Sequence, residues 1–99
     1  MILCYIPCKD KKEAEKIAKF LLDKKLIACA NIFPIISISK WTKKIRAIKE
    51  HILIVKTNKN FNAIKKEIEK IHSYKIPCIL EIKVKANDKY DKWVRSEVK

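Results

Sequence analysis

Two long runs of alternating apolar side chains, joined by a short polar turn, make up residues 26–56, LIACANIFPIISISKWTKKIRAIKEHILIVK. Ile and Phe favour strands, and side chains that alternate along a strand line opposite faces of a sheet. The turn residues Trp41-Thr42-Lys43-Lys44 are polar enough for a chain reversal, so the pattern predicts one long β-hairpin. Its second strand, residues 45–56, is about twice the usual length of ~5–6 residues.

A strand and a helix precede this hairpin. Residues 1–6 are apolar on both alternating faces, which is typical of a central strand covered on two sides. Residues 10–25 carry apolar side chains at the three-and-four spacing of a buried helical stripe. Asp10 is the expected N-cap, because Glu13 follows three positions later in the order of a capping box.

A helix, a strand and a last helical segment follow the hairpin. The helix over residues 61–71 has either Asn58 or Asn60 as its cap, and the strand over residues 80–84 alternates apolar with charged side chains. Asn87 or Asp88 caps the last segment. The predicted order is therefore β-α-β-β-α-β-α, an α+β ferredoxin-like fold with an extra C-terminal helix, in one domain over residues 1–99.

Two helices cover only one face of the four-stranded sheet that this order predicts. The long hairpin would leave an apolar face and bare strand edges in water, which is an aggregation hazard. We therefore expect copies of the chain to cover one another in a closed symmetric oligomer.

The chain is strongly basic, with 24 Lys and Arg against 11 Asp and Glu and a net charge of +13. This charge attracts polyanions, but Arg46 and Arg95 are the only arginines, and base recognition favours the planar guanidinium. The predicted strands also hold few aromatic side chains on which bases could stack. We expect no specific nucleic-acid partner.

The four cysteines are expected to be free thiols in a cytoplasmic protein. No apolar run reaches the ~20 residues that cross a bilayer, and residues 1–4 lack the pattern of a signal peptide. No Cys-x-x-Cys is present, so a local zinc motif is not predicted. Cys4 and Cys8 are expected in the core or at its rim, with Cys8 exposed at the strand end.

Several segments, in order, resemble the CutA family of divalent-cation tolerance proteins, from the first strand to Trp93. The resemblance is carried by Ala28-Cys29-Ala30-Asn31-Ile32 with Pro34, Trp41 with Ile45, Glu50 before Ile52-Leu53-Ile54-Val55-Lys56-Thr57, His72-Ser73-Tyr74 before Pro77-Cys78-Ile79, and Tyr90 with Trp93. It implies a cytoplasmic homotrimer of ferredoxin-like subunits, similar in architecture to PII signalling proteins. It also implies a role in tolerance of copper and other divalent metals.

The resemblance implies Cys29 and His72 as metal ligands, and Cys78 stands where the family commonly has Glu. A thiolate in place of a carboxylate favours Cu(I) or Zn(II). The predicted metal site is therefore Cys29, His72 and Cys78, for copper or another divalent metal ion. The alternative for Cys29 is a packing role, and for His72 a hydrogen bond to a carbonyl or a helix C-cap. The turn departs from the family's Trp-Glu-Gly-Lys, because Lys43 replaces the glycine.

No catalytic constellation is found, so the sequence predicts a protein that is not an enzyme. The acids Glu50, Glu67, Glu69 and Glu81 fit surface or capping roles. Two other functions stay open: a basic nucleic-acid-binding module, and a PII-like regulator that holds a small anion between subunits and signals to an unknown protein partner.

Overall fold

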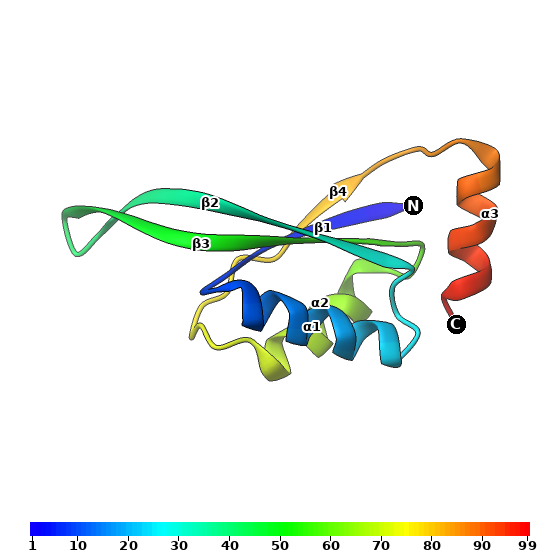
Figure 1. Cartoon of the computed structure of the whole chain (residues 1–99), viewed down its shortest axis with the longest axis horizontal. Coiled ribbons are helices and arrows are strands. Elements are labelled where there is room, and N and C mark those ends of the chain that lie inside the picture. Colours follow the sequence, from blue (N-terminus) through cyan, green and yellow to red (C-terminus); the bar gives the residue numbers. More distant parts are fainter.

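A four-stranded antiparallel sheet with two helices packed on one face forms the body of the molecule (Figure 1). The computed structural model describes all residues, 1–99. Its elements are β1 (Ile2–Cys8), α1 (Lys11–Asp23), β2 (Cys29–Trp41), β3 (Lys44–Thr57), α2 (Phe61–Ile71), β4 (Leu80–Lys83) and α3 (Asp88–Glu97). The strand order is β2-β3-β1-β4, which confirms the predicted ferredoxin-like fold with an extra C-terminal helix.

The helices begin where polar caps satisfy their first amide groups. The Asp10 carboxylate accepts a hydrogen bond from the Glu13 amide at 2.8 Å, as the capping box predicts. For α2 the structure selects Asn60, whose side chain accepts from the Ala63 amide at 2.9 Å. Asn87 occupies the N-cap of α3 without a side-chain hydrogen bond.

The core lies between α1, α2 and the sheet face that they cover. Residues opposite one another in an antiparallel pair point to the same face, and β1 places Ile6 opposite Leu53 and Cys4 opposite Val55. These side chains are buried together with apolar residues of both helices, which are Ala14, Ile17, Ala18, Leu21, Ile64 and Ile68. Alternate residues of β1 are therefore core residues, whereas the residues between them are only half-buried. The strand is central, as predicted, but within one chain the helices cover one of its faces and not both.

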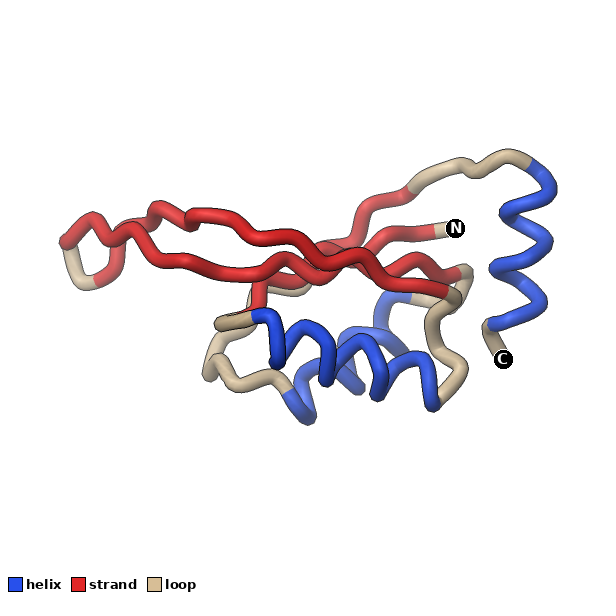
Figure 2. The backbone as a smooth tube through the Cα atoms, viewed as in Figure 1, coloured by secondary structure: helices blue, strands red, loops and turns tan.

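The β2–β3 hairpin continues well beyond the rest of the sheet (Figures 1 and 2). The pairing of β1 with β3 ends at Cys8 and His51, whereas β2 and β3 stay paired as far as Trp41 and Lys44. We call the projecting residues 35–50 the hairpin arm. Its tip is a two-residue turn in which Thr42 and Lys43 have positive φ angles of 49° and 67°. Such a turn has the strand twist of a type I′ hairpin, which usually has Asn and Gly at these positions.

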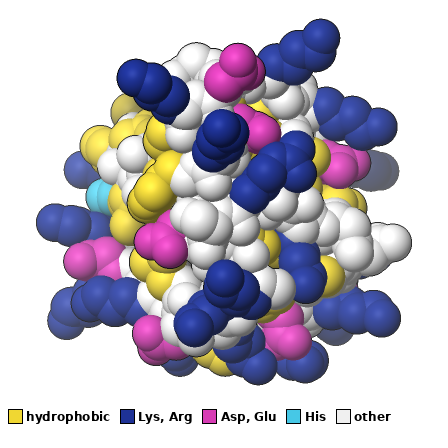
Figure 3. Space-filling view, turned by 90° about the vertical axis from the view of Figure 1, so that its right-hand side faces the viewer, with side chains coloured by type: hydrophobic (Ala, Val, Ile, Leu, Met, Phe, Trp, Pro, Cys, Tyr) yellow, Lys and Arg dark blue, Asp and Glu magenta, His cyan; other side chains and the backbone are white.

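Helix α3 stands apart from the other helices, at the end of the sheet opposite the hairpin arm (Figure 1). Figure 3 views this end, where lysine and arginine side chains surround the surface and acidic side chains lie between them. The basic charge on this face is therefore spread out rather than gathered in one track. None of the helices is long and apolar enough to cross a membrane.

Candidate metal centre

The three ligands that the sequence predicts lie at two different ends of the sheet. Cys29 pairs with Lys56, which pairs in turn with Leu3 near the start of β1. His72 lies at the other end, because one of its ring nitrogens, Nε2, is 2.9 Å from the Pro7 carbonyl oxygen. Leu3 and Pro7 are separated by about 13 Å at ~3.3 Å per strand residue. One chain therefore does not bring Cys29 and His72 to the same ion.

Cys29 makes a packing contact with the C-terminal helix. Its sulfur and the Tyr90 hydroxyl lie 3.2 Å apart and share a hydrogen bond. The Lys56 ammonium lies 5.5 Å from the centre of the Tyr90 ring, within the range of a cation–π interaction. The hydrogen bond to Cys29, followed by burial, raises the pKa of Tyr90. Cys29 thus helps to hold α3 against the sheet, which agrees with the packing alternative.

His72 is the C-cap of α2 and connects this helix to the end of β1. Its Nδ1 accepts a hydrogen bond from the Tyr74 amide at 3.0 Å. The neutral ring therefore carries its proton on Nε2, which donates to the Pro7 carbonyl. Both alternatives expected from the sequence, the helix cap and the bond to a carbonyl, are present in the structure.

Glu13 belongs to the same end of the sheet, although its place in the sequence predicts only a capping-box role for it. Glu13 is 7% exposed, and its carboxylate accepts hydrogen bonds from the Lys9 amide at 3.0 Å and the Ser73 amide at 2.8 Å. Burial by itself would raise the pKa of Glu13, but the hydrogen bonds and the nearby His72 outweigh burial and lower it. The capping box was the available signal, since it turns this side chain back toward residues 8–10.

Cys8 is fully buried, which corrects the expectation that it would be exposed at the strand end. The physical reason is that β1 continues two residues past Ile6 and pairs Cys8 with His51. Burial, followed by the negative charges of Glu13, Glu50 and Asp10, raises the pKa of the Cys8 thiol to about 12. The group is therefore a protonated thiol, and its sulfur lies 3.6 Å from the Ile6 carbonyl oxygen as a weak donor.

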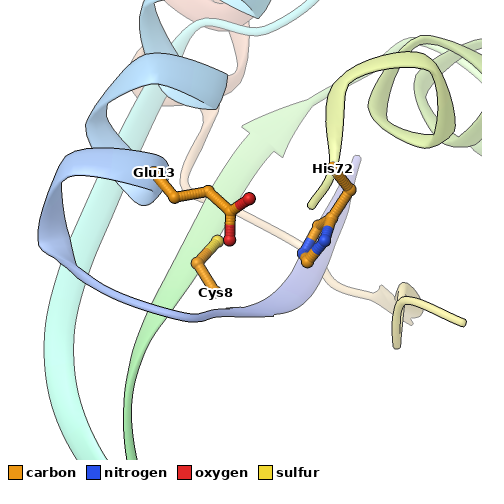
Figure 4. Close-up of side chains that lie close together, drawn as sticks. All are labelled: Cys8, Glu13 and His72. Atoms are coloured by element: carbon orange, nitrogen blue, oxygen red, sulfur yellow. The ribbon is translucent and has the colours of Figure 1, made fainter. Parts of the chain in front are cut away.

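The possible ligand atoms of Cys8, Glu13 and His72 all lie within 4.8 Å of one another. Figure 4 shows the Cys8 sulfur next to the Glu13 carboxylate, with the His72 ring beside them. The three side chains come from the end of β1, the first turn of α1 and the C-cap of α2. We call these three residues the buried cluster.

Glu50 is a second buried carboxylate at this end, and the expectation of a surface role was wrong. It is 5% exposed and accepts a hydrogen bond from the Tyr74 hydroxyl at 2.6 Å. Burial and this bond raise the pKa of Tyr74. Cys78 is an exposed thiol whose pKa is raised by partial burial and by the charge of Glu50. Of the predicted ligands, His72 and Cys78 thus lie at the same end of the sheet.

Thiolate, imidazole and carboxylate groups together suit a transition-metal ion of borderline softness. The possible ligand atoms of the buried cluster already take part in hydrogen bonds within the chain. Each of these bonds contributes about 1 kcal/mol to the stability of the fold, or about 2 kcal/mol where the charged carboxylate takes part. Zinc coordination in small structural sites contributes about 10–16 kcal/mol. An ion bound here must offset both these hydrogen bonds and the loss of the Cys8 proton, which the raised pKa of about 12 makes more costly.

The fold defines the class of protein: it is a ferredoxin-like α+β protein with the architecture of PII-like proteins. The PII-like protein CutA from Nostoc sp. PCC 7120 superposes on 100% of this chain and 98% of its own with a TM-score of 0.91, at 24% identity, which shows the fold alone. A sequence model of the family described as CutA1 divalent ion tolerance protein matches residues 2–97. The chain therefore belongs to the CutA family, as the resemblance indicated.

Proteins of two archaea illustrate how similar the relatives are. A divalent-cation tolerance protein CutA of Archaeoglobus fulgidus is 48% identical over 81 residues, which cover 81% of this chain and 79% of the relative. The crystal structure of CutA1 from Pyrococcus horikoshii is 37% identical and covers 100% of this chain and 99% of its own, with a TM-score of 0.96. The solved structure of the Archaeoglobus fulgidus protein, described as periplasmic, has a TM-score of 0.94 at 41% identity and covers both chains completely.

Proposed function

We propose that this CutA-family chain is a non-enzymatic homotrimer that binds copper or another transition-metal ion and so contributes to divalent-cation tolerance. The observation that carries the metal proposal is the gathering of thiol, imidazole and carboxylate groups at one end of the sheet. Cys78 and the buried cluster, which includes His72, all lie there. In a chain with a net charge of +13, acidic side chains held together in this way favour a cation locally.

Copper titration of the reduced protein tests this proposal. The wild-type chain is expected to bind copper, and a variant carrying Cys29→Ser, His72→Ala and Cys78→Ser is expected to bind it more weakly. Single variants then separate the two ends of the sheet, with Cys29→Ser expected to have the smallest effect. Equal binding by wild type and triple variant would remove these three residues from the site.

The trimer is supported by the apolar surface of the hairpin arm and by the strand edges. Ile38 and Ile45 are 71% and 77% exposed, and Trp41 at the tip is also exposed. β2 is an edge strand over all its 13 residues, so its outer backbone groups are free to pair with another chain. Soluble proteins rarely leave such surfaces bare, and a ring of identical chains would cover them without leaving an open edge.

Light scattering and sedimentation measure the oligomer directly. The wild type is expected at three times the chain mass, and Ile38→Glu is expected to shift it toward monomer by placing a charge in the interface. Leu22→Glu is the matched control, because Leu22 is an exposed apolar residue on α1, away from the hairpin arm. A stable monomeric wild type at micromolar concentration would contradict the proposal.

We also propose a cytoplasmic location, which the four free thiols support. Cell fractionation with an antibody to the native chain tests it. Recovery in an extracytoplasmic fraction would overturn it.

A further inference from the structure

We propose that Cys8, Glu13 and His72 form one binding site for a single borderline divalent ion of the Zn²⁺ type. This inference rests on the proposed metal-binding function and deepens it by naming a ligand set that the resemblance did not imply. Two of its members, Cys8 and Glu13, are outside the set predicted from the sequence. Their donor atoms and those of His72 already lie within 4.8 Å of one another (Figure 4).

The ligand types select the class of ion. Zinc binds cysteine sulfur, histidine nitrogen and carboxylate oxygen, and three protein ligands leave a fourth position for a water or another donor. Cu(I) prefers soft thiolate and thioether donors, so the carboxylate of Glu13 disfavours it relative to Zn²⁺. The buried cluster is therefore expected to prefer Zn²⁺, whereas an exposed thiol such as Cys78 suits Cu(I) better.

The three ligands are held by the core rather than by a mobile surface loop. Cys8 is fully buried and Glu13 nearly so, and each is positioned by a different secondary-structure element. Metal-bound histidines usually donate their second ring N–H to a backbone carbonyl or carboxylate. The Nε2–H of His72 already donates to the Pro7 carbonyl, so a residue outside the cluster holds the imidazole ring in its orientation.

Binding exchanges a proton for the ion. The S–H bond of Cys8 breaks, its proton passes to the buffer, and the thiolate sulfur forms the bond to Zn²⁺. The Glu13 carboxylate and the neutral imidazole supply lone pairs without a change of oxidation state. Their present hydrogen bonds to backbone amides are given up in part.

Cobalt titration of the reduced, metal-free, full-length protein tests the site, since Co²⁺ replaces Zn²⁺ and is visible. Wild type is expected to bind one Co²⁺ per chain and to show the d–d absorption of a tetrahedral ion with a thiolate-to-cobalt charge-transfer band. Cys8→Ser should remove the charge-transfer band and weaken binding at least about tenfold. Cys78→Ser and Cys29→Ser are the matched controls and should leave both unchanged.

X-ray absorption of the zinc-loaded wild type gives a second readout that needs no variant to fold. The site predicts one sulfur neighbour per zinc, with nitrogen and oxygen neighbours completing the shell. No sulfur, or more than one, would overturn the assignment, as would a charge-transfer band that survives in Cys8→Ser. If the band depends on Cys78 instead, this site is wrong while the proposed function stands; if the wild type binds no metal, both fail.

Discussion

Replacing Glu13 by glutamine should destabilise the metal-free protein by about 2–3 kcal/mol at pH 7. Glu13 is a buried residue, and its carboxylate accepts two amide hydrogen bonds, from Lys9 at 3.0 Å and Ser73 at 2.8 Å. Hydrogen bonds to a charged group contribute about 1.5–3 kcal/mol each. Glutamine keeps one acceptor oxygen but turns an NH₂ group toward one of the two amide donors, so about one such bond is lost.

The cost of Glu13→Gln should depend on pH with a definite sign. The pKa of Glu13 is lowered in the folded chain, whereas the unfolded value is about 4.3. The stabilisation is therefore complete above about pH 4.3 and is lost as the pH falls through the lower folded pKa. At that point the protonated carboxyl resembles the amide, and the two proteins should have similar stability.

Urea unfolding with a chelator present, at one fixed chain concentration, measures this difference at pH 7 and at about pH 2.5. Chain concentration must be fixed because the stability of an oligomer depends on it. Glu15→Gln is the matched control, two positions further along α1 and outside the buried cluster. Equal midpoints for Glu13→Gln and Glu15→Gln at pH 7 would refute the reasoning, as would a gap that stays unchanged at the lower pH.

Three further changes test other parts of the structure. Thr42→Asn with Lys43→Gly should raise the free energy of unfolding by about 1–2 kcal/mol, because Thr42 and Lys43 have a left-handed backbone that costs an ordinary residue about that much. An unchanged urea midpoint would contradict this. Tyr90→Phe removes the hydrogen bond to Cys29, so amide hydrogen exchange should become faster in α3 while that of β1 stays the same. Exchange in α3 at the same rate in the variant and the wild type would count against this contact. In the native protein Cys4 and Cys8 should resist alkylation at pH 8, because their pKa values are about 11 and about 12. The unfolded chain should take up four labels, one on each free cysteine. Labelling of Cys8 before unfolding would argue against its burial.

Alternation and capping residues were enough to predict the order and type of every element, because both signals are local. The hairpin is a clear case: its alternating side chains and polar turn lie in one continuous stretch. The cap of α2 was left between Asn58 and Asn60, since either residue can accept the hydrogen bond. Only the backbone of the folded chain shows that Asn60 accepts it from Ala63.

The end of β1 was predicted too early, and this error concealed the buried cluster. The apolar pattern was followed only to Ile6, and the next residue is Pro7, which lacks the N–H that a central strand needs. The structure removes this objection, since β4 pairs with β1 only as far as Tyr5. Beyond Tyr5 the strand has one neighbour instead of two, so it tolerates a proline and continues to Cys8. How far a neighbouring strand reaches is a tertiary fact that local patterns do not contain.

The separation of Cys29 from His72, in contrast, follows from the predicted topology. β1 and β2 are each antiparallel to β3, so they run in the same direction and their first residues lie at one end of the sheet. β4 is antiparallel to β1, so the segment between α2 and β4, with His72 and Cys78, lies beside the last residues of β1. Any ion held by both Cys29 and His72 must therefore bridge two chains. Within one chain, the thiol, carboxylate and imidazole groups that lie close together are those of the buried cluster, at the Cys8 end.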